Sequence, residues 1–365
     1  MRYAEITGWG KCVPPAVLTN DDLSTVIDTS DAWIRPRTGI GQRHISHVST
    51  SELATVAAKR ALAAAGLTGK DLDLIILATA SPDTLIPNVA STLQANIGAQ
   101  CGAFDMNAAC SGFLYALGLA AGQIRSGQSR QILVVGAERL SFFINWTQRE
   151  SAVLFGDGAG AVILEAVDSD TPTGVLSYQT HNDPDGRDFL KVDGFGTNMD
   201  RENPHAMEFF LQFEGKEIFK RAIAGMGQLS HQVLEDSGLS IGDIDLVIPH
   251  QANIRIINTL ASKMRVPLEK TFVNIERYGN TSAATIPIAL CDALAAGCIH
   301  GGANLLTCAF GAGLTSAAAT IKWGDRTQPK ADSNAALSPC HRTALELIES
   351  AIARDKSGAE RVKAG

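Results

Sequence analysis

The sequence has few charged residues and lacks a basic segment. Charged residues make up 19% of the 365-residue chain, with 31 Lys and Arg against 38 Asp and Glu, for a formal net charge of -7. A nucleic-acid-binding protein usually presents a basic domain, so this balance argues against that class. The chain also lacks a long apolar run of membrane type and an apolar signal core. We therefore expect a cytoplasmic protein that binds neither nucleic acid nor membrane.

The cysteines lack the spacing of a disulfide framework or a metal site. There are seven, an odd number, and no two of them form a Cys-x-x-Cys motif. Such usage is typical of a reducing compartment, where single thiols are buried or reactive. No other cluster of metal-ligating residues stands out, so we expect no metal and no resident cofactor.

One cysteine, Cys110, has unusual surroundings. Residues 105–117 read DMNAACSGFLYAL, in which small residues surround the thiol and an apolar run follows it. This pattern predicts a buried helix with Cys110 in its first turn, where the helix dipole would lower the pKa of the thiol. The alternative is a free cysteine that only packs in the core. The stretch alone leaves both open.

Alternating apolar runs predict an α/β fold. Residues 73–80 read DLIILATA, as expected of a strand covered on both faces, and 52–65 form an alanine-rich helical segment. A further apolar run, ILVVG, follows the Cys110 helix, so strands and helices alternate along the chain. This order is typical of helices layered on a buried sheet.

The second half of the chain repeats the first. AAGLTGKDLD from residue 64 aligns with DSGLSIGDID from residue 236, an offset of 172 residues that also aligns Cys110 with Ser282. One register over some seventy residues indicates duplication. We therefore expect two α/β halves, 1–170 and 171–324, followed by an extension at 325–365.

Polar residues mark the ends of elements in the second half. His250 directly follows the apolar strand DLVIP, and Asn280 precedes the helix that matches the Cys110 helix. Because related halves meet where strand ends and helix starts converge, we expect Cys110, His250 and Asn280 to lie close together. For His250 alone, a core histidine bonded to a backbone carbonyl is the alternative.

Four motifs together resemble one known family. AACSG around Cys110, HQANIRI from His250, GNTSAA around Asn280 and FGAGLT from Phe310 are similar to the ketoacyl-acyl-carrier-protein synthase III family, over residues 2 to about 324. The resemblance implies the thiolase-like five-layered αβαβα fold, a homodimer, and a Cys110, His250 and Asn280 triad. It also implies an acyltransferase of fatty acid biosynthesis that condenses an acyl-CoA with malonyl-acyl-carrier-protein, by decarboxylation, through an acyl group on Cys110.

The resemblance assigns roles to residues outside this triad. It places backbone N–H groups of Cys110 and Ala312 in an oxyanion hole, Trp33, Arg37 and Arg149 at coenzyme A, Ile86, Phe155 and Phe310 around the acyl group, and Lys216, Lys220 and Arg255 at the carrier protein. Ile86 would reach across the dimer into the partner's pocket. Coenzyme A enters as part of a substrate. The alternatives are ordinary surface arginines near an aromatic ring and lysines on a solvated helix face.

Three rival functions remain. A degradative thiolase needs a second catalytic cysteine, and Cys308 is one residue out of register for that role. A specialised synthase III-like acyltransferase of secondary metabolism and an inactive scaffold of the same fold are the others.

The extension at 325–365 is longer than the family needs. It predicts a linker and a short helix with an apolar stripe at Ala344, Leu345, Ile348, Ala351 and Ile352.

Overall fold

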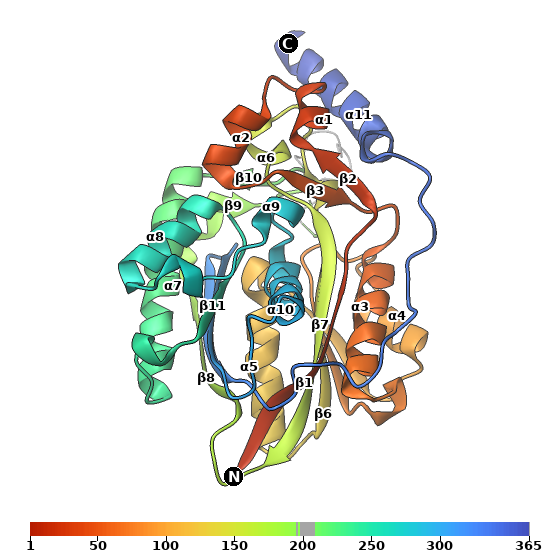
Figure 1. Cartoon of the computed structure of the whole chain (residues 1–365). Coiled ribbons are helices and arrows are strands. Elements are labelled where there is room, and N and C mark those ends of the chain that lie inside the picture. The colour runs from red at the N-terminus through yellow and green to blue at the C-terminus, as the bar shows by residue number, and fades with distance from the viewer. Residues whose placement is uncertain (195, 198–208, 365) are drawn as a thin grey trace.

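Two β-sheets form the framework of the computed structural model, which describes residues 1–194, 196–197 and 209–364 (Figure 1). The first sheet has the order β1-β7-β6-β4-β5. Strand β4 is parallel to its neighbours β6 and β5, whereas β7 is antiparallel to its neighbours β1 and β6. Its strands are β1 (Arg2–Cys12), β4 (Leu74–Ala78), β5 (Gly102–Met106), β6 (Gln131–Arg139) and β7 (Asp157–Asp168).

The second sheet repeats this plan with the order β11-β12-β13-β8. Its strands are β8 (Gly174–Asn182), β11 (Leu246–Pro249), β12 (Asn304–Gly311) and β13 (Thr315–Lys322). The parallel pair β11 and β12 corresponds to β4 and β6, and β8 corresponds to β1, each within one residue of the offset of 172. The repeat seen in the sequence is therefore a repeat of strands.

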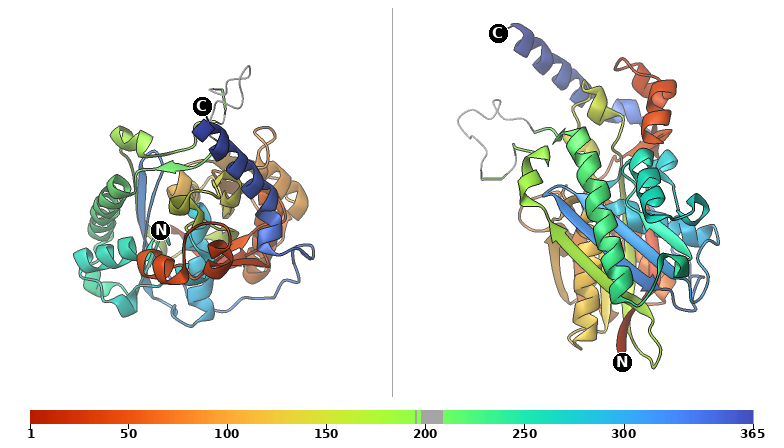
Figure 2. Two further views of the ribbon diagram at one scale, coloured as in Figure 1. Left: turned by 90° about the horizontal axis from the view of Figure 1, so that it is seen from above. Right: turned by 90° about the vertical axis from the view of Figure 1, so that its left-hand side faces the viewer.

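Helices form three layers around the two sheets, as Figures 1 and 2 show. Between the sheets lie α5 (Gly112–Arg125) and α10 (Thr285–Ala295). The first sheet is covered from outside by α3 (Thr50–Ala65) and α4 (Val89–Ile97), and the second by α7 (Gly215–Asp236) and α8 (Ile254–Met264). The five-layered αβαβα prediction is confirmed.

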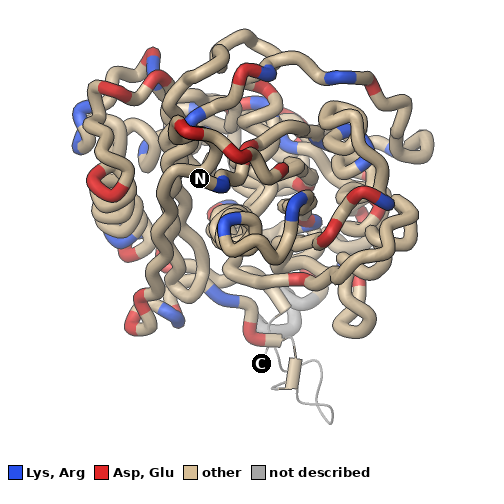
Figure 3. Tube along the Cα trace, turned by 90° about the horizontal axis from the view of Figure 1, so that it is seen from below, with Lys and Arg blue, Asp and Glu red and all other residues tan. Residues whose placement is uncertain are grey.

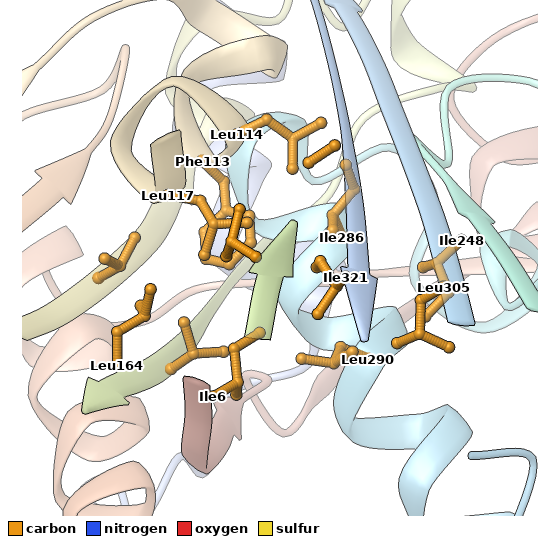
Figure 4. Packing of buried hydrophobic residues seen from close by; sticks show 14 of the residues in the cluster. Ile6, Phe113, Leu114, Leu117, Leu164, Ile248, Ile286, Leu290, Leu305 and Ile321 are labelled. Carbon is orange, nitrogen blue, oxygen red and sulfur yellow. The ribbon is translucent and has the colours of Figure 1, made fainter. Parts of the chain in front are cut away.

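The middle layer holds a large apolar core. Side chains of α5, such as Phe113 and Leu117, pack with Ile286 and Leu290 of α10, and strands of both sheets close the cluster (Figure 4). Because α10 is almost entirely buried and most of α5 is buried, the two halves share one core. The turns that precede these helices are thereby brought to the same level between the sheets.

Short elements and the helix of the C-terminal extension gather at one end of the molecule, above the sheets in Figure 1. They are β2 (Ala16–Thr19), α1 (Asn20–Ser24), α2 (Asp31–Thr38), β3 (Gln42–Ile45), α6 (Arg149–Ala152), β9 (Leu190–Lys191), β10 (Gln212–Phe213), α9 (Ile275–Tyr278) and α11 (Ala344–Ala364). The helix of the C-terminal extension, α11, is longer than the short helix expected. Ala344 and Ile348 of its apolar stripe are buried against this end.

The extension reaches this end by running along α3. Its backbone donates from Lys330 N to Ala64 O at 3.0 Å, and Arg60 of α3 donates to Ala335 O at 2.9 Å. Among the described helices, none has both the length and the apolar character needed to cross a bilayer.

Candidate active site

Cys110 lies in a 3-10 turn, Ala109–Ser111, directly before α5. The sequence predicted it one step later, in the first turn of the helix. The turn is tied to the second half of the chain, because Thr315 Oγ1 donates to Ala108 O at 3.0 Å and Ser111 Oγ donates to Thr315 O at 3.2 Å. The thiol is thereby held at the junction of the two halves.

Gly311 allows the glycine-rich loop after β12 to approach this turn closely. A β-carbon added at Gly311 would lie 2.7 Å from Cys110 N, inside the contact distance of real side chains. Only glycine therefore lets the two backbones meet without a shift. The predicted oxyanion donor Ala312 follows directly, so its backbone lies next to the Cys110 turn.

The expected lowering of the thiol pKa is wrong. Burial raises the pKa of Cys110 to about 12, the Ser282 hydroxyl acts in the opposite direction, and the Glu138 carboxylate raises it further. Burial disfavours the charged thiolate, because the thiolate loses its contact with water. Cys110 is therefore a neutral thiol at neutral pH, and its proton must leave as a new bond to sulfur forms.

His250 directly follows β11 and is 3% exposed. Its backbone N donates to Cys308 O at 2.8 Å, and its ring Nδ1 lies 2.6 Å from Thr285 Oγ1. The partner is therefore a hydroxyl and not the backbone carbonyl of an ordinary core histidine. Burial lowers the pKa of His250 to about 3, so the ring is neutral. The Thr285 hydroxyl lies 3.0 Å from Ser282 O as well as beside His250 Nδ1, and it can donate its one proton to only one of them. When it donates to Nδ1, the ring proton is on Nε2, where it can be donated.

Asn280 is 6% exposed and has a fixed orientation. Its side-chain Oδ1 accepts Ser282 N at 2.8 Å, and its backbone bonds to Leu154 O and Gly156 N. Because Oδ1 is engaged, the amide oxygen and nitrogen cannot exchange places freely. Among the residues that the structure describes, none hydrogen-bonds to Nδ2, which leaves that nitrogen as a donor toward a ligand.

Ser282 connects the three predicted catalytic residues. Its hydroxyl interacts with the Cys110 thiol, its N–H bonds to Asn280, and its carbonyl oxygen lies 3.0 Å from the hydroxyl of Thr285, which also contacts His250. Ser282 is the residue that the offset of 172 pairs with Cys110. The two turns that precede α5 and α10 therefore meet, and the meeting brings Cys110, His250 and Asn280 to one place.

Sequence reasoning missed Glu138, at the end of β6. Its carboxylate is fully buried and accepts hydrogen bonds from the Ala80 N–H at 3.1 Å, the Thr79 hydroxyl at 3.3 Å, the Ser282 hydroxyl at 3.0 Å and the Ser81 hydroxyl. Burial raises the pKa of Glu138 to about 7, against the effect of these donors. A lone glutamate that ends an apolar strand was the available sequence signal.

The predicted coenzyme A residues lie together at the end of the molecule that holds α2 and α6. The guanidinium carbon of Arg149 is 4.3 Å from the centre of the Trp33 ring, and that of Arg37 is 4.7 Å from it. Arg37 also donates to Trp33 O at 3.1 Å. An aromatic face beside two fixed cations can hold a ring and a phosphate.

The predicted acyl-pocket residues are not brought together within one chain. Phe155 is buried, and its backbone pairs with that of Asn280 in an isolated parallel β-bridge. Phe310 packs in the outer cluster against α7, because successive side chains of β12 point to opposite faces of the sheet. Ile86 is 85% exposed, in the loop that precedes α4. It can line an acyl pocket only in a neighbouring chain.

The predicted carrier-docking cations are all exposed. Lys216 and Lys220 lie on α7, and Arg255 lies at the start of α8, which packs beside α7. Within the described part of the chain, no carboxylate lies within 4 Å of their charged groups. Elsewhere charges of both signs are mixed, as Figure 3 shows for the side opposite the gathered short elements.

Two sequence motifs have structural roles. Cys308 is buried in the outer cluster, on the face of the second sheet covered by α7, so it does not supply the second cysteine of a thiolase. The glycine-rich stretch GDGAGA at residues 156–161 begins strand β7 and therefore lacks the following helix of a dinucleotide-binding loop. The Asp157 carboxylate there accepts Ser46 N at 2.7 Å and Ser141 N at 2.9 Å.

Comparison with known proteins identifies the family. Residues 104–184 match the family model "3-Oxoacyl-[acyl-carrier-protein (ACP)] synthase III", and residues 234–323 match the model of its C-terminal part. A beta-ketoacyl-[acyl-carrier-protein] synthase III 2 from Vibrio vulnificus is 57% identical over 351 residues, 96% of each chain. A beta-ketoacyl-[acyl-carrier-protein] synthase III from Roseiflexus castenholzii is 47% identical over 88% of this chain and 98% of its own.

Solved structures agree with this assignment. The crystal structure of 3-oxoacyl-[acyl-carrier-protein] synthase III from Aquifex aeolicus is 43% identical, covers 88% of this chain and all of its own, and superposes with a TM-score of 0.82. At this identity the likeness extends beyond the fold to the sequence. The chain, with a cysteine, a histidine and an asparagine meeting between two duplicated halves, belongs to the 3-oxoacyl-[acyl-carrier-protein] synthase III family.

Proposed function

We propose that the protein condenses an acyl-CoA with malonyl-acyl-carrier-protein, with loss of CO2, to give 3-oxoacyl-acyl-carrier-protein and start fatty acid biosynthesis. The observation that carries this proposal is the network around Ser282, which connects a partly buried thiol, a neutral imidazole and an oriented amide. These are the groups that a covalent, decarboxylating condensation requires. An inactive scaffold would not need all three.

The first half-reaction acylates Cys110. The sulfur attacks the thioester carbonyl, a carbon–sulfur bond forms, and the bond to coenzyme A breaks, with the thiol proton ending on the departing coenzyme A. The transient oxyanion is stabilised by the backbone N–H groups of Cys110 and Ala312, and the close approach of Gly311, the neighbour of Ala312, to Cys110 N supports this role.

The second half-reaction uses His250 and Asn280. As malonyl-acyl-carrier-protein loses CO2, negative charge develops on its thioester oxygen, and His250 Nε2–H and Asn280 Nδ2–H donate to that oxygen. The carbon freed by CO2 loss then attacks the acyl group on Cys110, and the sulfur leaves as thiolate and regains a proton. The Ser282 and Thr285 contacts hold both donors in place.

The proposed assembly is a cytoplasmic homodimer that meets acyl carrier protein through α7 and α8. The exposed apolar side chains of Leu85 and Ile86 support a chain-to-chain contact. The exposed cations Lys216, Lys220 and Arg255 support docking of an acidic carrier, because a local positive field steers association whatever the net charge. Seven free cysteines suit a reducing compartment.

Mass spectrometry of the intact protein tests the proposed function. Incubation with acetyl-CoA or a longer acyl-CoA should add one acyl group, on the peptide that contains Cys110. Addition of malonyl-acyl-carrier-protein should then remove this group and yield 3-oxoacyl-acyl-carrier-protein. A protein that stays unmodified with every acyl-CoA from two to eight carbons would contradict the proposal.

The two substrates should separate in kinetics. Arg149→Ala should raise the KM for acyl-CoA roughly tenfold, because a charged contact to a phosphate beside Trp33 is lost. Lys216→Glu combined with Arg255→Glu should instead raise the KM for malonyl-acyl-carrier-protein and leave that for acyl-CoA nearly unchanged. Steady-state assays with one substrate varied at a time measure both effects.

Lys263→Glu, which reverses an exposed charge in the last turn of α8, is the control for the charge-reversal variant. It should change neither KM appreciably. If Arg149→Ala raised both KM values equally, the assignment of Arg149 to coenzyme A would fail.

Acyl length is predicted to depend on Ile86. Isoleucine is smaller than phenylalanine, so the partner's pocket should accept chains longer than acetyl, and butyryl- to octanoyl-CoA should be used. Ile86→Phe should shift kcat/KM toward acetyl-CoA by roughly 10- to 100-fold, since added bulk fills the volume that longer chains need. Strict use of acetyl-CoA by the unmodified protein would show that another residue limits the length.

A further inference from the structure

The C-terminal helix α11 is firmly attached to the end of the molecule that holds the predicted coenzyme A residues. Ala344 and Ile348 are 2% and 4% exposed and pack in a cluster that includes Leu18 of β2 and Ile45 of β3. Farther along the helix, the buried Asp355 carboxylate accepts Trp146 N at 2.9 Å. In Figure 1 the helix lies beside α1 at the end that also holds α2 and α6. It is therefore part of the folded body.

The same helix is an addition to an otherwise complete synthase. The Roseiflexus relative and the Aquifex structure match 88% of this chain but 98–100% of their own, and the share left out is about as large as segment 325–365. The Vibrio relative, in contrast, matches over 96% of both chains. Some synthases of this family thus lack a counterpart of the extension, and others match along nearly their whole length.

An open surface pocket of about 510 Å³ lies where α11 meets the segments at 26–28 and 147–150; we call it the cavity. It is lined by residues 26–28, residues 147–150 and one residue of the extension, Lys356. Arg149, which also stacks on Trp33, belongs to this lining, so the cavity adjoins the predicted coenzyme A site. The Arg149 Nε is buried and has no hydrogen-bond partner among the described residues.

Lys356 determines whether positive and negative groups balance around this cavity. Arg149 and Lys356 are its cations, and Asp28 and Glu150 are its carboxylates. Without Lys356, one arginine would face two carboxylates, a setting that disfavours a polyanion. With Lys356 the charges balance, and Arg37 on the Trp33 ring adds a nearby cation. An ammonium group on a flexible stem suits a phosphate that arrives from solution.

We propose that α11 forms one wall of the acyl-CoA site and that Lys356 binds a phosphate group of the incoming coenzyme A. Lys356 is then a specificity residue that the extension adds to the site, and the anchor at Asp355 positions it. This inference rests on the proposed function, since it concerns the acyl donor of the first half-reaction. It adds a substrate contact that the core of the family, ending near residue 324, does not contain.

Two acyl donors test the inference. Acetyl-CoA carries the phosphates, whereas acetyl-pantetheine offers the same thioester without any. Lys356→Gln should raise the KM for acetyl-CoA roughly three- to tenfold, as expected for one partly exposed contact to phosphate, and should leave kcat/KM for acetyl-pantetheine unchanged. Lys356→Arg should restore most of the loss. Lys330→Gln, on the same extension but beside Gly66 at the far end of α3, should behave like the unmodified protein.

Each remaining outcome decides against the inference in its own way. If Lys356→Gln left the KM for acetyl-CoA unchanged while acetyl-CoA still loaded Cys110, the inference would fall and the proposed function would stand. Equal losses with both donors would show that Lys356 supports the fold and not a phosphate. If acetyl-CoA failed to load Cys110 even in the unmodified protein, the proposed function and the inference would fall together.

Discussion

Cys110→Ala should abolish acyl transfer while the protein stays folded. Removing the sulfur removes the site of the covalent intermediate, so condensation should fall at least about a thousandfold. Some decarboxylation of malonyl-acyl-carrier-protein should remain, because His250 and Asn280 keep the contacts to Thr285 and Ser282 that orient them. Intact-protein mass spectrometry should show no added acyl group, and release of labelled CO2 measures the remaining decarboxylation.

Cys308→Ala is the matched control, because it removes a buried thiol that lies in the outer cluster, on the face of the second sheet covered by α7. This variant should still be acylated and should still condense. If Cys308→Ala abolished acylation in a folded protein, or if Cys110→Ala still carried an acyl group, the nucleophile would have been assigned wrongly.

His250→Ala and Asn280→Ala should show the opposite defect. Each removes one donor to the oxygen that becomes negative during decarboxylation, and loss of such a donor costs about a hundred- to a thousandfold in rate. Acylation of Cys110 should continue, since its oxyanion is stabilised by backbone N–H groups. Single-turnover assays separate the two steps, with acyl-protein measured before and after malonyl-acyl-carrier-protein is added.

The pH dependence gives a second measure of His250. Burial lowers its pKa to about 3, so its ring stays neutral above roughly pH 4, and condensation should not be lost through protonation of His250 between pH 5 and 7.

Circular dichroism must show that the His250→Ala and Asn280→Ala variants are folded. Loss of acylation in a folded His250→Ala protein would mean that the histidine acts in the first half-reaction as well.

Much of the fold could be predicted because repetition is visible in a linear sequence. Similar segments at an offset of 172 residues indicated two related halves, and β4 and β11 begin at Leu74 and Leu246, at that same offset. Buried parallel strands have continuous apolar runs whatever surrounds them. The layers followed, because helices that alternate with such strands must cover their faces.

The chemistry of the thiol could not be predicted in the same way. The sequence pointed to a helix dipole, a local effect, and therefore to a lowered pKa for Cys110. The opposite direction results from burial and from Glu138, a residue 28 positions farther along the chain on a different strand. Desolvation depends on everything that packs around a group, and no local pattern records it.

The sequence by itself determined the family, the layered fold and the identity of the residues able to do the chemistry. Only the tertiary structure decided how they meet. Ser282 reaches Cys110 because α5 and α10 pack in one middle layer, and Lys356 reaches the cavity beside Arg149 because α11 folds back over the core. Contacts between positions some two hundred residues apart depend on how whole layers pack, and packing is a property of the folded chain.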